Sequence, residues 1–132
     1  MTLKIATVTL VVDNYDRAIA FYRDVLGLEL VSDTDMGGGK RWVSVEGAGG
    51  ARLLLAQADG DRQRAAVGNQ TGGRVGFFLE TDDFERDYAT LVGNGVRFLE
   101  APRHEPYGSV AVFEDPFGNK WDLIEPKSAR EL

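Results

Sequence analysis

Three ionisable side chains in the C-terminal half of the sequence could transfer a proton in a reaction. His104 is the only histidine, and a neutral imidazole accepts or donates a proton near pH 7. Asp122 stands among apolar and aromatic residues, where burial would raise the pKa of its carboxyl and suit it as a general base. Glu80 is expected to share a cleft with Asp122, so two carboxylates could share a proton or bind an amine there. The catalytic candidates are therefore Asp122, Glu80 and His104; the alternatives are an exposed loop histidine and carboxylates that orient a ligand or pair with a basic residue.

An internal repeat identifies the elements that must position these residues. Residues 7–26 and 76–94 share an order of apolar, acidic, aromatic and basic positions, and the strand patterns that follow also match. Each copy begins with an alternating strand, continues with a helix that a glycine ends, and finishes with three more strands. The expected N-cap is Asp13 in the first helix and Asp82 or Asp83 in the second. Strands are predicted near residues 3–12, 28–34, 40–46 and 51–57, and again near 74–81, 96–99, 109–114 and 119–125.

This order of elements predicts an α+β fold built from two tandem βαβββ modules. The length of 132 residues fits one domain, residues 1–132. Within it, module 1 spans about residues 3–58, a glycine-containing polar linker about 59–73, and module 2 about 74–126.

Composition and charge exclude several classes of partner. The formal net charge is -6, and no cluster of Lys and Arg provides the basic surface that a nucleic-acid or anionic-membrane binder needs. No apolar run approaches the roughly 20 residues of a membrane helix. The sequence has no cysteine, so neither a disulfide nor a thiolate metal site is expected. No signal peptide is recognised, so the cytoplasm is the expected location.

Two stretches carry a family resemblance. The first comprises residues 8–13 (VTLVVD), 18–22 (AIAFY) and 26–28 (LGL), and the second is residues 112–123 (VFEDPFGNKWDL). In this order they resemble the vicinal oxygen chelate superfamily, which includes glyoxalases, bleomycin-resistance proteins and extradiol dioxygenases. The resemblance implies that the modules form a curved sheet around a cleft, with helices on the outer faces, and that the protein is a homodimer.

Alternation along the strands predicts which side chains line that cleft. Val8, Leu10 and Val12 should face the first helix, which leaves Thr7 and Thr9 on the other side. The same reasoning in the second module sends Phe77 and Leu79 to the helix and Phe78 to the cleft, with the loop from His104 to Tyr107 at its rim. The expected ligand-binding residues are Thr7, Thr9, Trp42, Leu54, Gly76, Phe78, Tyr107 and Asp122.

The resemblance also implies four positions for a divalent metal, and these carry Thr7, Leu54, Gly76 and Asp122. Only Asp122 is an ordinary metal ligand, whereas tight binding takes three or four side-chain donors. We therefore expect no metal and no cofactor.

Two functions are compatible with these residues. The first is a glyoxalase/bleomycin-resistance-like binding protein that sequesters a small planar or cationic compound. The negative net charge and the aromatic residues of the chain suit such a ligand. The second is a metal-dependent or acid/base enzyme of the same superfamily: a lyase, an isomerase or a dioxygenase-like member. The expected partners are a small-molecule ligand and a second copy of the chain.

Overall fold

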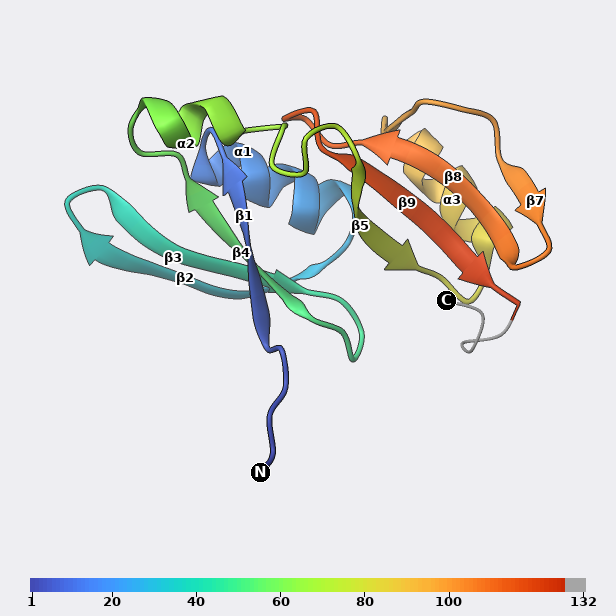
Figure 1. Cartoon of the computed structure of the whole chain (residues 1–132), viewed down its shortest axis with the longest axis horizontal. Helices are drawn as coiled ribbons and strands as arrows, with labels where there is room; N and C mark the ends of the chain where they lie inside the picture. The colour runs from blue at the N-terminus through green and yellow to red at the C-terminus, as the bar shows by residue number, and fades with distance from the viewer. Residues whose placement is uncertain (128–132) are drawn as a thin grey trace. The chain divides into compact units, whose positions relative to one another are not determined.

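The computed structural model describes residues 1–127, which fall into two compact units (Figure 1). Unit 1 spans Met1–Gln70, and unit 2 begins at Thr71. Unit 1 contains β1 (Thr7–Val12), α1 (Tyr15–Ile19), the π-helical turn η1 (Ala20–Val25), β2 (Glu29–Gly37), β3 (Lys40–Glu46), β4 (Arg52–Gln57) and α2 (Asp61–Ala66). Unit 2 contains β5 (Val75–Glu80), α3 (Phe84–Gly93), β6 (Arg97–Phe98), β7 (Arg103–Glu105), β8 (Gly108–Glu114) and β9 (Lys120–Pro126).

The two sheets have the same topology, which confirms the α+β fold read from the repeat. Sheet A of unit 1 has the order β1-β4-β3-β2, and sheet B of unit 2 has the order β5-β9-β8-β6, with β7 added beside β8. In each sheet the first and last long strands pair in parallel (β1 with β4, β5 with β9), and the other pairs are antiparallel. The first strand of each unit therefore lies at an edge of its sheet.

The first helix begins one residue later than the sequence predicted. Asn14, not Asp13, is the N-cap, and its side-chain oxygen accepts a hydrogen bond from the backbone N–H of Arg17 at 2.9 Å. Asp13 instead forms an ion pair with the Arg17 guanidinium at 2.6 Å. Either side chain is a good cap, and the choice depends on which residue has extended backbone at the helix start, here Asn14. The helix then widens into η1, and Gly27 ends it with a φ of 77°.

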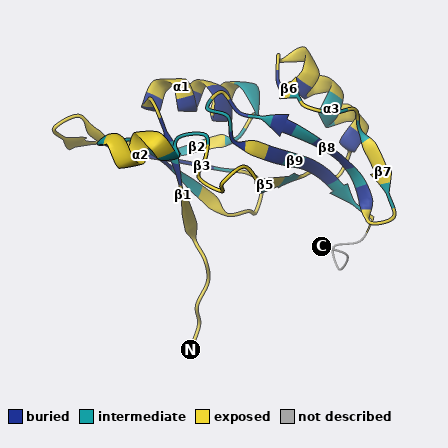
Figure 2. Ribbon diagram, turned by 45° about the horizontal axis from the view of Figure 1, so that its top comes forward, coloured by how far each residue is buried: buried dark blue, intermediate teal, exposed yellow. Residues whose placement is uncertain are grey.

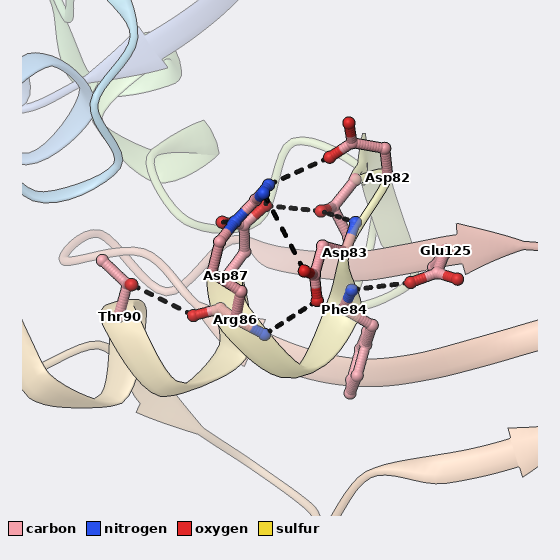
Figure 3. Close-up of polar contacts among 8 residues, drawn as sticks. Asp82, Asp83, Phe84, Arg86, Asp87, Thr90 and Glu125 are labelled. Carbon is pink, nitrogen blue, oxygen red and sulfur yellow. Dashed lines mark hydrogen bonds and ion pairs between the residues drawn. The ribbon is translucent and has the colours of Figure 1, made fainter.

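The helix α3 of unit 2 is held at its N-terminus by a network of acidic side chains, which Figure 3 shows. Asp83 is the N-cap and accepts from the backbone N–H of Arg86 at 3.1 Å. Glu125 on β9 accepts from the backbone N–H of Phe84 at 2.7 Å, so a strand side chain satisfies a second free donor of the helix. The Arg86 guanidinium pairs with Asp82 at 2.9 Å. This network ties α3 to sheet B.

Each unit has its own core, mostly on the helix side of its sheet, and Figure 2 marks the buried residues in dark blue. In unit 1, Leu10 pairs in register with Leu55, and both are completely buried. Val8 faces the same side but is 42% exposed, so the expectation that it packs under the helix was wrong. Because β1 is an edge strand, a neighbouring strand covers Val8 on one side only.

The core of unit 2 is a row of aromatic rings that crosses the strands of sheet B. Phe77 stacks on Trp121 with ring centroids 4.8 Å apart, and Trp121 stacks on Phe113 at 5.9 Å. Phe98 on β6 continues the row at 5.6 Å from Phe113, and Tyr88 of α3 packs against Phe98 at 4.6 Å. Aromatic ring contacts therefore hold α3 against sheet B, in addition to the burial of apolar surface.

The turn between β8 and β9 is held by the side chain of Asp115. Asp115 Oδ1 accepts from the backbone N–H groups of Phe117 and Asn119, and Asp115 Oδ2 accepts from the Asn119 side chain at 2.8 Å. Asp115 and Asn119 are both buried. A closed polar network of this kind specifies one turn geometry.

Two elements were not expected from the sequence. The helix α2 lies within the stretch read as a linker, and it is exposed along its length (Figure 2). The short strand β7 lies in the segment expected to be a loop. After α2, the Gln70 side chain donates to the carbonyl of Thr9 at 2.7 Å and accepts from the N–H of Val11 at 2.9 Å. This amide fills the hydrogen-bonding position of a neighbouring strand at the edge of β1.

Candidate functional site

The face of sheet A that points away from the buried Leu10 and Leu55 carries four of the expected ligand-binding residues. Side chains that pair across neighbouring strands lie on the same face. Thr9 pairs with Leu54, and Leu54 pairs with Ser44, which places these three in one row. Thr7 and Trp42 follow by alternation along β1 and β3. We call this surface face A; its residues are Thr7, Thr9, Trp42, Ser44 and Leu54.

Face A is mostly neutral. Trp42 is 46% exposed, so its ring is accessible to a stacking partner. Ser44 is buried and shares a hydrogen bond of 2.6 Å with Ser32 on β2. Face A can therefore offer an indole ring and threonine hydroxyls.

The corresponding face of sheet B brings together Phe78, Glu80 and Asp122. Phe78 pairs with Asp122, which pairs in turn with Val112, and Glu80 pairs with Ile124. Their helix-side neighbours Trp121 and Leu123 are buried, so this surface points away from α3. We call it face B; its residues are Phe78, Glu80, Arg103, Val110, Val112, Asp122 and Ile124. Phe78 is the most exposed aromatic of the described chain, at 64%.

Asp122 is the most unusual group on face B. Its Oδ1 is buried and has no hydrogen-bond partner among the described residues. Burial among apolar side chains raises the pKa of this carboxyl above its ordinary value; the charge of Arg103 opposes the shift and that of Glu100 adds to it. A buried carboxylate oxygen without a partner is costly. Asp122 as a whole is half-buried, so a ligand that donates a hydrogen bond to its carboxyl would offset that cost.

Arg103 reaches face B from β7 but is held by other carboxylates. Its guanidinium lies 2.9 Å from Glu100 and 3.2 Å from Glu105. A hydrogen bond to Glu100, and a smaller contribution from one to Tyr107, raise the pKa of Arg103 above its ordinary value. Tyr107 lies between β7 and β8 and is 36% exposed. The sequence did not point to Arg103 or Glu100, because β7 was expected to be a loop.

His104 lies on the other side of sheet B from Asp122 and Glu80. It pairs in register with Ser109, which pairs with Glu125, and these positions face α3. The imidazole Nδ1 is 2.8 Å from Ser109 Oγ, and the ring packs edge-on against Phe84 at 6.5 Å. The structure thus brings together two of the three catalytic candidates, Asp122 and Glu80, and places His104 on the opposite face.

Gly76 contributes backbone and no side chain. It forms a bulge where the pairing of β5 with β9 shifts between Val75 and Phe77. A Cβ at Gly76 would lie 2.5 Å from Thr71 Cγ2, so the close approach of Thr71 explains the glycine.

The residues at the four positions that the resemblance implies for a metal offer too few donors for a divalent ion. Thr7 offers a neutral hydroxyl, Leu54 and Gly76 offer no donor, and Asp122 offers one carboxylate. Within residues 1–127, no three His, Asp or Glu side chains cluster as a metal site would require.

Two hollows in unit 1 lie apart from the expected site residues. One, of about 480 Å³, lies between the N-terminal arm and the loop before β4; the other, of about 450 Å³, lies at the β2–β3 hairpin. The second is lined by Asp33, Asp35, Arg41 and three glycines, and Arg41 is already paired with Asp33 at 2.8 Å and with Asp16 at 2.9 Å. The cleft expected between the sheets stays a prediction.

The fold and the sequence define the class of protein. The family model of the Glyoxalase/Bleomycin resistance protein/Dioxygenase superfamily matches residues 4–123, and the chain belongs to this superfamily. Its sequence is 47% identical over 128 residues to an uncharacterized protein of Shewanella frigidimarina, covering 95% of each chain.

Two solved structures have the same fold at 28% identity. The crystal structure of UcmS2 matches with a TM-score of 0.80 over 94% of this chain and 98% of that one. TnmS3, an antibiotic binding protein from Streptomyces sp. CB03234, matches with a TM-score of 0.77 over 96% of this chain and 98% of that one. Within residues 1–127, no helix has the length and apolar character needed to cross a membrane.

Proposed function

We propose that this protein binds and sequesters a small planar or cationic molecule without a metal and without converting it chemically. The ligand contacts face B through Phe78 and Asp122. Face A, with Thr7, Thr9, Trp42 and Leu54, is a second ligand-binding surface, which offers an indole ring and hydroxyls but no carboxylate. The superfamily includes bleomycin-resistance proteins, and the similar protein TnmS3 is described as an antibiotic binding protein.

The pairing of Phe78 with Asp122 carries this proposal. An aromatic ring that is 64% exposed lies beside a carboxylate whose buried Oδ1 lacks a partner. A planar ligand that stacks on the ring and donates a hydrogen bond to the half-buried Asp122 carboxyl would satisfy both groups at once. The net charge of -6 favours the approach of a cation.

An acid/base enzyme is the second candidate, and the raised pKa of Asp122 favours it. A carboxyl with a raised pKa is better matched to proton transfer near neutral pH. Glu80 lies on the same face and could act as a second carboxylate. Recovery of a bound compound in chemically changed form, or turnover that depends on added Ni²⁺, Zn²⁺, Mn²⁺ or Fe²⁺, would favour an enzyme over a binding protein.

We also propose that the protein acts in the cytoplasm as a homodimer. The N-terminal arm before β1 exposes Leu3 at 82% and Ile5 at 84%, and β5 is an edge strand of its sheet. Pairing with a second copy would cover such surface. Light scattering at micromolar concentration should give the mass of two chains, and a monomeric mass would contradict this part of the proposal.

Ligand binding can be tested with two probes: proflavine, a planar fluorescent cation, and bleomycin. Proflavine should gain fluorescence anisotropy when protein is added, and mass spectrometry should recover both compounds unchanged. Phe78→Ala and Asp122→Asn should each weaken binding at least about tenfold, the effect of losing roughly 1.4 kcal/mol. Val92→Ala and Glu85→Gln on the exposed side of α3 are the matched controls and should leave affinity unchanged. Full affinity in both face B variants would refute the site.

A further inference from the structure

We infer that face B selects compounds in which a protonated amine is attached to an aromatic ring by a short linker, with the ring on Phe78 and the amine on Asp122. This inference rests on the proposed function and narrows its ligand class to arylalkylamines.

The register of sheet B sets the spacing between the two ligand groups. Phe78 and Asp122 are direct partners on adjacent parallel strands, and their side chains leave the same face. Neighbouring strands lie roughly 4.8 Å apart, so the centre of a ring stacked on Phe78 and a nitrogen bound to Asp122 should be roughly 5 Å apart. A linker of two carbon atoms between ring and nitrogen spans this distance.

The surroundings of Asp122 favour a cationic nitrogen. β9 has two neighbouring strands, and on face B these place Phe78 and Glu80 of β5 and Val112 of β8 around Asp122. Arg103 lies one strand further away, on β7, and its charge and that of Glu100 also act on Asp122. Arg103 is already paired with Glu100 and Glu105, so the carboxylates around it outnumber its one positive charge. With Asp122 ionised, the carboxylates of Asp122, Glu80, Glu100 and Glu105 outnumber the one guanidinium of Arg103, which disfavours an anionic ligand.

The apolar residues beside Asp122 favour ligands that donate a hydrogen bond over ligands that do not. Ile124 and Val110 are buried on the same face, and Val112 is half-buried. Water solvates a carboxylate poorly in such surroundings, so a ligand without a donor leaves the half-buried carboxyl of Asp122 without compensation. A charge-assisted hydrogen bond from an ammonium group is the strongest replacement for that missing partner.

Binding of this kind should be linked to proton release. Burial raises the pKa of free Asp122, and a bound ammonium stabilises the carboxylate form and lowers that pKa. Affinity for the amine should therefore rise as pH increases through the pKa of free Asp122, and then level off. Asp122→Asn should remove this dependence.

Three indole compounds that differ in one group test the inference by calorimetry at neutral pH. Tryptamine carries the amine, tryptophol a hydroxyl and indole-3-acetate a carboxylate. Tryptamine should bind at least about tenfold more tightly than tryptophol, as one charge-assisted hydrogen bond predicts, and indole-3-acetate should bind most weakly.

Two variants separate the roles of charge and ring. Asp122→Asn should bring tryptamine and tryptophol to equal affinity, and Asp122→Leu should do the same if the amide disturbs the fold. Phe78→Leu should weaken all three compounds, while Glu85→Gln on α3 serves as the charge control.

The outcomes distinguish this inference from the proposed function. If proflavine binding depends on Phe78 and Asp122 but tryptamine and tryptophol bind equally, the inference is overturned and the binding function stands. If no probe depends on either residue, both are overturned.

Discussion

The two units share one sheet topology but carry different chemistry at equivalent positions. In unit 1 the row across β1, β4 and β3 is Thr9, Leu54 and Ser44. In unit 2 the row across β5, β9 and β8 is Phe78, Asp122 and Val112. An uncharged row with hydroxyls at its ends in one copy thus corresponds to an aromatic ring, a buried carboxylate and an apolar neighbour in the other.

This difference shows which face of each sheet the fold depends on. The helix-side partners are apolar in both copies: Leu10 with Leu55, and Leu79 with Leu123. A change there would expose core surface or leave a cavity. On the opposite face, a change at an exposed or half-buried position such as Phe78 or Asp122 alters what the sheet can bind. The repeat therefore preserves its core while its two open faces specialise.

The largest expected effect is a break in the core of unit 1. Leu10 is completely buried, whereas its counterpart Leu79 is half-buried. Leu10→Ala should lower the free energy of unfolding by about 2–5 kcal/mol. Leu79→Ala should cost less, because less of its surface leaves water.

Urea denaturation followed by tryptophan fluorescence can assign this loss to a unit. The chain has two tryptophans, Trp42 in unit 1 and Trp121 in unit 2. In a Trp121→Phe background only unit 1 reports, and in a Trp42→Phe background only unit 2 reports. An equal loss for Leu10→Ala and Leu79→Ala would show that burial does not distinguish the two copies.

The next effect is expected at the turn between β8 and β9. Asp115→Ala should cost about 2–3 kcal/mol, because the buried donors of Asn119 and the N–H of Phe117 lose their acceptor. Asp115→Asn keeps one side-chain oxygen and should cost less. The corresponding loop of unit 1 is made of glycine and alanine, so Ala48→Gly there should change the urea midpoint little. A neutral Asp115→Ala would mean that this turn does not need the network.

A smaller effect is expected at the bulge of β5, a feature that the pairing of β1 with β4 lacks. Gly76→Ala places a methyl group 2.5 Å from Thr71 Cγ2 and should cost about 1–2 kcal/mol. Thr71→Ser removes that methyl and keeps the hydroxyl that donates to the carbonyl of Arg74. The double variant should therefore recover most of the stability, and failure to recover would place the strain elsewhere.

The strands and helices could be predicted because alternation and helical spacing record which side of each element is buried. The faces of Phe78 and Asp122 followed from the same alternation, and the register agrees with it. The position of His104 did not follow, because its side of β7 depends on a strand too short to show a pattern. The pairing of Gln70 with β1 also left no sequence signal, since it joins residues far apart in the chain.

The smallest effect concerns the charge that distinguishes Asp122 from Leu54. Burial raises the pKa of Asp122 in the folded protein above its ordinary value of 3.8, so the folded state holds this proton more tightly than the unfolded state does. Between the pKa of Asp122 in the unfolded chain and its pKa in the folded protein, the folded state binds more protons. The contribution of Asp122 to stability therefore falls as pH rises through that window.

Asp122→Asn removes the cost of a buried charge, and Asp122→Leu makes the position resemble unit 1. Both variants should be as stable as the parent or slightly more stable at pH 7, and the gap should close as pH falls toward 3.8. Urea midpoints measured from pH 3.5 to 7 test this, with Glu85→Gln as the control for an exposed carboxylate. A gain in stability of the parent relative to Asp122→Asn as pH rises would mean that the folded protein stabilises the Asp122 carboxylate without a ligand. That result would contradict the argument that this carboxyl lacks a hydrogen-bond donor.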